Sequence, residues 1–287
     1  MKIKIVTDST SSFPPSLAKK EKIGLFESKV LLEGKDLKEI TDIDQKELAD
    51  RVPTLDPYPT TSVASPQEAL DILEHADKEN CDEILYIGVS PTISNQIPSV
   101  KSAFRKFKNK DKVTIHECGV STSSQGALVH NALKLLKQGK SVKEIIKELD
   151  VMKTQTFTIG ISPSFDILFK TGKVQKKASI SLISKLLKLK PLYEIILDVG
   201  ARGAGAGKGF KGAIKEAMKK FSEQISSDLE YDLIISDAFN TDYNEVIEQE
   251  ARKIIKVKDV LSWRITPCVM LSTGVGSFQI TLVPHIE

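Results

Sequence analysis

Short runs of β-branched and aromatic residues alternate with segments of helical periodicity through the first half of the chain. The segment PQEALDILEHADKEN (residues 66–80) places Ala69, Leu70, Leu73 and Ala76 on one face of a predicted helix. The other helices predicted here are residues 97–107, 123–138 and 141–149. The predicted strands are residues 2–7, 83–88, 113–118 and 157–162. Strands and helices in alternation favour a parallel sheet with helices on its faces.

The pattern becomes more mixed beyond about residue 156. Strands are predicted at residues 191–197, 231–236, 260–265 and 278–283, and helices at residues 211–225 and 244–255. We therefore predict an α/β fold with two α/β domains. Residues 1–155 would form an N-terminal, Rossmann-like domain with a parallel sheet, and residues 156–287 a C-terminal domain with a mixed sheet.

Composition and charge exclude several classes of protein. The chain has 287 residues, of which 40% are hydrophobic, so two cores can be formed. A net charge of +3 and only 6% aromatic residues do not indicate nucleic-acid binding. Cys81, Cys118 and Cys268 lie far apart, which indicates neither a disulfide framework nor a metal site. With no signal-peptide or membrane-spanning pattern, we expect a cytoplasmic protein.

Hydroxyl side chains gather in four segments that lie after predicted strands or before predicted helices. These segments are residues 9–12 (STSS), 60–65 (TTSVAS), 90–94 (SPTIS) and 121–124 (STSS). The carboxyl ends of parallel strands meet at one edge of a sheet, where helix N-termini also point and ligands bind. Neutral donors at such an edge suit an oxyanion such as a carboxylate or a phosphate.

The same segments offer little for catalysis. They contain no His, and Asp8 and Glu117 are the acids beside them. Serine is a poor nucleophile without a neighbouring base, so anion binding is favoured over chemistry. Helix capping is the alternative for each hydroxyl taken singly, because Ser and Thr accept hydrogen bonds from the first turn of a helix.

Several motifs resemble the DegV family, the fatty-acid-binding subunits of bacterial fatty acid kinase. Asp8-Ser9 follows the first strand as in that family, and TTSVASP (residues 60–66) is similar to its TTSQPSP. Ile93-Ser94 falls at the Leu-Ser of its SSxLSGT loop. Leu189-Lys190-Pro191-Leu192 resembles its (I/L)KP(I/L) segment, and Asp198 with Gly200 its following DG turn.

The resemblance implies a non-catalytic protein that holds a long-chain fatty acid in a tunnel between two α/β domains. The carboxylate would meet Thr61 and Ser94, with Ser62, Ser272 and Thr273 as further candidates. The protein would present this carboxylate to a separate ATP-dependent kinase, which forms the acyl-phosphate for phospholipid synthesis. Lys173 stands where the family has Arg, and Ser272 where it has His.

Two stretches support alternatives. Residues 207–212 (GKGFKG) formally match GxGxxG, which leaves open a small-molecule phosphotransferase, although a flexible loop before the helix at Lys211 is the simpler interpretation. Seven lysines and no acid lie in residues 167–193. A solvated face is the common meaning, but Lys173, Lys176 and Lys177 could contact an anionic membrane. A divergent lipid carrier without a kinase partner is the third possibility.

Overall fold

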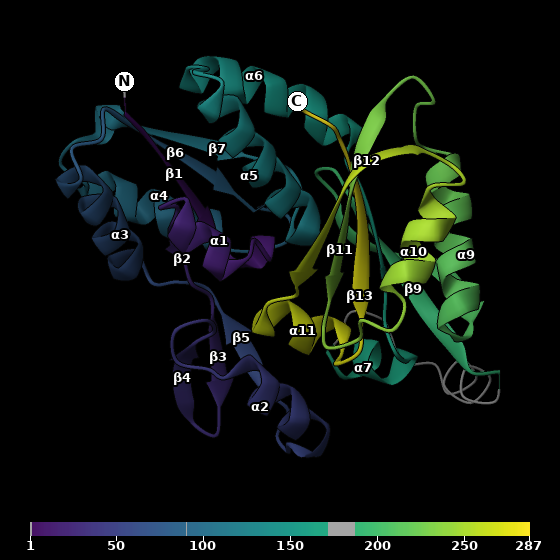
Figure 1. The fold of residues 1–287 in the computed structure, drawn as a ribbon. Helices are drawn as coiled ribbons and strands as arrows, with labels where there is room; N and C mark the ends of the chain where they lie inside the picture. Colours follow the sequence, from purple (N-terminus) through teal and green to yellow (C-terminus); the bar gives the residue numbers. More distant parts are fainter. Residues whose placement is uncertain (1, 90, 172–186) are drawn as a thin grey trace.

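The structure is a computed structural model that describes residues 2–89, 91–171 and 187–287 (Figure 1). Lys173, Lys176 and Lys177 therefore lie outside the described residues. The chain folds into three sheets with helices around them. The two larger sheets follow one another along the sequence, and the smallest sheet is formed by residues from the first quarter of the chain.

The first sheet is fully parallel, in the order β2-β1-β6-β7. Its strands are β1 Ile3–Asp8, β2 Gly24–Phe26, β6 Glu83–Gly88 and β7 Val113–Glu117. The helices of this half are α1 Pro15–Lys20, α3 Pro66–Lys78, α4 Gln96–Lys106, α5 Thr122–Lys137 and α6 Val142–Met152. Successive residues of β1 face opposite sides: Val6 packs in the core with α3 and α4, and Ile5 in the core with α5 and α6.

The second sheet is mixed, in the order β10-β9-β8-β13-β11-β12. Its strands are β8 Phe157–Ile161, β9 Leu189–Ile196, β10 Gly200–Lys208, β11 Glu230–Asp237, β12 Lys256–Arg264 and β13 Phe278–Pro284. Helices α9 Gly209–Ser222 and α10 Asn244–Ala251 cover one face. Only β11 and β12 are parallel, whereas β13 runs antiparallel to both of its neighbours. The prediction of an α/β fold with one parallel and one mixed sheet is confirmed.

The third sheet, β4-β3-β5, does not follow from the periodicity. Its strands are only three or four residues long: β3 Lys29–Leu32, β4 Lys35–Lys38 and β5 Thr60–Ser62. It packs with α2 Gln45–Arg51 and α11 Pro267–Thr273, while α7 Phe165–Lys170 contacts α11. Short 3-10 helices occupy Ser9–Ser11, Val52–Thr54, Lys110–Lys112 and Lys153–Gln155. Strands this short show too few alternations to be recognised in the sequence.

Residues 207–212, at the end of the glycine-rich stretch 200–212, are not a flexible loop, and that interpretation was wrong: they end strand β10 and begin α9. Residues 200–208 form β10, which pairs antiparallel with β9 and has an irregularity between Gly203 and Gly205. At Gly207 a Cβ atom would lie 2.3 Å from the backbone nitrogen of Ala213, so the turn from β10 into α9 requires glycine. The glycines are explained by close backbone approach rather than by flexibility.

Helix α5 joins the two large sheets and lies between them in Figure 1. Its first turn binds the second sheet, because Ser123 donates to Gln279 and the Ser124 hydroxyl lies 2.6 Å from that of Thr158. Further along, Asn131 Nδ2 donates to the carbonyl of Pro284 at 3.1 Å. Because α5 packs on both sheets, a division into domains at residues 155 and 156 stays a prediction.

Replacing Gly126 with alanine is expected to destabilise this interface. A Cβ atom at Gly126 would lie 2.5 Å from the Ser11 carbonyl oxygen and 2.8 Å from Trp263 Cζ3. Overpacking of this kind costs roughly 1–3 kcal/mol, and the better helix propensity of alanine offsets about 1 kcal/mol. Chemical denaturation of Gly126→Ala should show a lower free energy of unfolding. Gly212→Ala in α9 is the control, since its nearest contact is 3.6 Å, and it should be neutral or stabilising.

Candidate functional site

The buried carboxylate of Asp8 organises the end of the first sheet. Its Oδ2 atom accepts hydrogen bonds from Tyr86 Oη at 2.9 Å, from the backbone N–H of Val89 at 3.0 Å and from Gln125 Nε2 at 3.0 Å. Burial raises the pKa of Asp8, and these hydrogen bonds, with one from Thr10, oppose the rise. Asp8 thus fixes Val89, at the start of the segment that carries Ser94.

Two of the four hydroxyl segments hold the protein together. Ser9 Oγ accepts the N–H of Ser28 at 2.8 Å, and Thr266 Oγ1 donates to the Ser9 carbonyl at 3.1 Å. Ser123 and Ser124 bind the second sheet, as described above. In these two segments the hydroxyls named serve structure, so they are not free to bind a ligand in this state.

The TTSVASP segment (residues 60–66) begins as a strand and ends at the N-terminal cap of helix α3. Thr60–Ser62 is β5, in which Thr61 pairs with Val30 of β3, and all three residues are exposed. Ser65 forms a capping box with Glu68, so the capping interpretation holds for this serine. Adjacent strand residues point to opposite faces, and Ser62 Oγ lies 3.5 Å from Asp36 Oδ1. Thr61 hydrogen-bonds to no other described side chain.

Ser94 lies half-buried just before α4. Its Oγ atom accepts the backbone N–H of Gln96 at 3.2 Å, and among the described residues its hydroxyl proton has no acceptor. The chain after β5 packs on the first turn of α4, because the N–H of Ala64 donates to Gln96 Oε1 at 3.2 Å. Thr61 and Ser94 therefore belong to neighbouring segments.

Ser272 and Thr273 lie on α11, with their hydroxyls turned back along that helix. Ser272 Oγ donates to the Cys268 carbonyl at 3.1 Å and Thr273 Oγ1 to the Val269 carbonyl at 2.9 Å. Thr273 Oγ1 also lies 2.8 Å from Ser277 Oγ. No side-chain hydrogen bond within the described ranges joins these two residues to Thr61 or Ser94.

Described residues form at least two clefts. The first, of about 440 Å³, lies between α1 and α3, with Ile23, Leu25 and Ile72 among its walls. The second, of about 420 Å³, is lined by the start of α9 at Gly209 and Phe210 and by Lys188 and Lys190. Neither cleft includes any of the five predicted site residues, and a tunnel between the domains stays a prediction.

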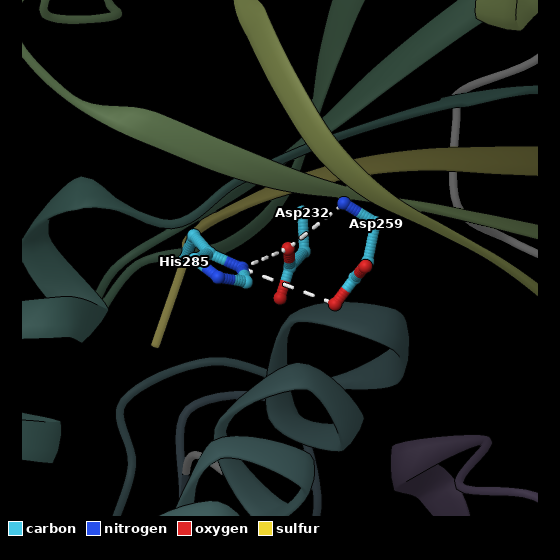
Figure 2. Close-up of side chains that lie close together, drawn as sticks. All are labelled: Asp232, Asp259 and His285. Atoms are coloured by element: carbon cyan, nitrogen blue, oxygen red, sulfur yellow. Dashed lines mark hydrogen bonds and ion pairs between the residues drawn. The ribbon is translucent and has the colours of Figure 1, made fainter. Parts of the chain in front are cut away.

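A charged cluster at the far end of α5 was missed by sequence reasoning, because its members are distant in sequence. His285 Nδ1 lies 2.6 Å from Asp232 Oδ1, and Asp259 lies beside them (Figure 2). The ammonium of Lys134 lies 3.1 Å from Asp232 Oδ2 and 3.6 Å from Asp259 Oδ2. Lysine thus already supplies the positive charge that a metal ion would bring to these carboxylates.

Glu39 is a second residue that sequence reasoning missed. It is 1% exposed, and its Oε2 atom accepts the N–H of Cys268 at 2.7 Å. Burial raises its pKa to about 7, against hydrogen bonds from Cys268 and Ser9 that lower it. Glu39 is one of three acids in the polar stretch GKDLKEITD and gives no sign of burial there, so only the fold reveals it.

No helix in residues 2–89, 91–171 or 187–287 is both long and apolar enough to span a bilayer. The fold and the polar sheet edge define an α/β protein with two large sheets, one small sheet, and hydroxyl groups beside the ends of its parallel strands. The family model described as "Uncharacterised protein, DegV family" matches residues 2–285, and the chain therefore belongs to the DegV family.

Relatives and solved structures agree with this assignment. A DegV domain-containing protein of Clostridium acetobutylicum is 32% identical over 194 residues, which is 68% of each chain. A DegV family protein from Thermus thermophilus, described as fatty-acid-binding, superposes with a TM-score of 0.86 at 23% identity over 99% of this chain and all of the other. A stearic-acid-binding protein from Eubacterium ventriosum gives a TM-score of 0.85 at 17% identity over 98% of both chains. At these identities the two structures establish the fold.

Proposed function

We propose that this protein binds a long-chain fatty acid and that Thr61 and Ser94 hold its carboxylate. The observation that carries the proposal is that the hydroxyl protons of Thr61 and Ser94, on neighbouring segments, have no acceptor among the described residues, beside an edge where Ser9, Ser123 and Ser124 serve structure. Membership of the DegV family supports the ligand class, since solved structures of this fold are described as binding fatty acids.

The physical argument concerns the two ends of the ligand. A buried carboxylate is costly unless hydrogen-bond donors meet its oxygens, and the hydroxyl protons of Thr61 and Ser94 meet that need. The acyl chain requires only apolar walls and contributes about 0.8 kcal/mol per buried CH₂. We assign Ser62, Ser272 and Thr273 lesser roles, because each hydroxyl already lies near another acceptor.

We further propose that the protein is a non-catalytic carrier that presents the carboxylate to a separate ATP-dependent fatty acid kinase. Lys173, Lys176 and Lys177 are the residues we assign to transient contact with an anionic membrane during ligand exchange. A lysine near such a surface contributes about 1 kcal/mol. A pull-down with the kinase of the same organism would separate this carrier from one that has no kinase partner.

Native mass spectrometry of protein purified from cells tests the ligand class. We expect an added mass equal to one long-chain fatty acid, which organic solvent releases for identification. Protein that carries no lipid, and that binds none after incubation with oleate, would contradict the proposal.

A phosphotransferase is the second candidate, favoured by one observation. The start of α9, at the end of the glycine-rich stretch, lines the second cleft together with Lys188 and Lys190. ATP turnover by the purified chain alone would support this candidate. We expect none.

A further inference from the structure

Glu39 links two parts of the proposed headgroup site. It directly follows β4, and β4 pairs with β3, which pairs in turn with β5 and Thr61. Its carboxylate reaches the second residue of α11, where it accepts the N–H of Cys268. Helix α11 carries Ser272 and Thr273. One side chain thus bridges the small sheet and the helix.

The chemistry of this bridge depends on whether Glu39 carries a charge. Its Oε1 atom is fully buried and has no hydrogen-bond partner among the residues the structure describes. A neutral carboxyl group tolerates such a place, whereas a carboxylate loses its hydration and is met only by the N–H and thiol of Cys268 and the hydroxyl of Ser9. Ionisation therefore weakens the contact between the small sheet and α11.

The groups that face Glu39 do not compensate for that charge. The thiol of Cys268, on α11, faces Glu39. The neutral hydroxyl of Ser9, in the 3-10 helix after β1, also faces it. Glu27, which binds the N–H groups of Ile40 and Thr41, is a like charge and raises the pKa of Glu39 further. No lysine or arginine in the described part of the chain forms an ion pair with Glu39.

We propose that Glu39 is a positioning residue of the fatty-acid headgroup site, and that its protonation holds the sheet carrying Thr61 against α11. The inference rests on the proposed function. With the pKa of Glu39 at about 7, the neutral form predominates at lower pH and the carboxylate at higher pH. The docked arrangement, and with it ligand retention, should weaken as pH rises through neutrality.

The first experiment measures dissociation of cis-parinaric acid, a fluorescent long-chain fatty acid, from the full chain between about pH 6 and about pH 8. We expect the dissociation rate of wild type to rise about fivefold, the lower end of usual coupling between sites. In Glu39→Gln, which keeps an acceptor for the Cys268 N–H, the profile should be flat. Glu33→Gln, an exposed acid in the β3–β4 turn, should behave as wild type. Titration of the probe affects all three proteins alike.

A second experiment needs no ligand. Hydrogen exchange of residues 266–273, expressed as protection factors, reports how firmly α11 is docked. Protection should fall with rising pH in wild type and Glu33→Gln but not in Glu39→Gln. Equal pH profiles in wild type and Glu39→Gln would overturn the inference. If no protein binds the probe while the protection factors behave as expected, the fatty-acid proposal fails and the pH-dependent docking by Glu39 stands.

Discussion

The double variant Thr61→Ala, Ser94→Ala should lose about a hundredfold in fatty-acid affinity. Each hydroxyl donates one hydrogen bond to a charged acceptor in the proposed complex, and such bonds contribute about 1.5–3 kcal/mol each. Two of them at the lower bound amount to about 3 kcal/mol, or about two orders of magnitude in Kd. Isothermal titration with oleate on delipidated protein measures the change.

Thr60→Ala is the matched control for this experiment. Thr60 precedes Thr61 in β5, is equally exposed and points to the other face of the strand. It should keep wild-type affinity. The removed hydroxyls donate to no other described residue, but Ser94 Oγ accepts the N–H of Gln96, so the double variant should stay folded with a Tm slightly below that of wild type. Full oleate affinity in the double variant would remove the assignment of both residues.

Lys134→Met should lower the free energy of unfolding by about 3 kcal/mol, because removing one partner of a buried ion pair leaves a charge without its counter-charge. The carboxylate of Asp232 is fully buried, and Lys134 is its ammonium partner across the interface. Lys134 also donates to the Ile286 carbonyl at 3.1 Å. Methionine keeps the apolar part of the side chain, so the decrease in the free energy of unfolding reports the contribution of the ammonium group. Urea denaturation, with the transition followed by the single tryptophan Trp263, provides the measurement.

Lys137→Met, one turn further along α5, provides the comparison. Its ammonium pairs with Glu21 at 2.9 Å, but 62% of the Lys137 side chain is exposed. Pairs of this kind contribute about 1 kcal/mol or less. The backbone N–H of Asp259 also donates to Asp232 Oδ1, at 3.2 Å. A Lys134 variant no less stable than the Lys137 variant would show that this N–H and His285 are enough to stabilise the Asp232 carboxylate.

The longer elements could be predicted because their periodicity repeats. The helix at residues 66–80 is observed as α3 Pro66–Lys78, and the strand at residues 83–88 as β6 Glu83–Gly88. The alternation of these elements was enough to indicate a parallel sheet and a second, mixed one. The short motifs around Thr61 and Ser94 likewise indicated the family, because they depend on residue identity and not on the fold around them.

Composition misled where backbone contacts decide the conformation. Glycines in residues 207–212 suggested a loop, yet these residues end strand β10, which pairs with β9, and begin α9, because Gly207 must approach α9 closely. The role of each serine was likewise ambiguous from the sequence. Ser65 caps a helix, Ser123 joins two sheets, and the Ser94 proton has no acceptor in the described part of the chain, although all three serines look alike in sequence.

The sequence by itself determined the order of the main elements, the α/β class and the family, since these follow from local periodicity and short motifs. Tertiary structure alone decided which polar groups are buried and what they face. Glu39 lies against Cys268, which is 229 residues away along the chain, and Lys134 lies against Asp232. Burial and long-range neighbours set the energy of a charge, and neither is encoded in the residues adjacent to it.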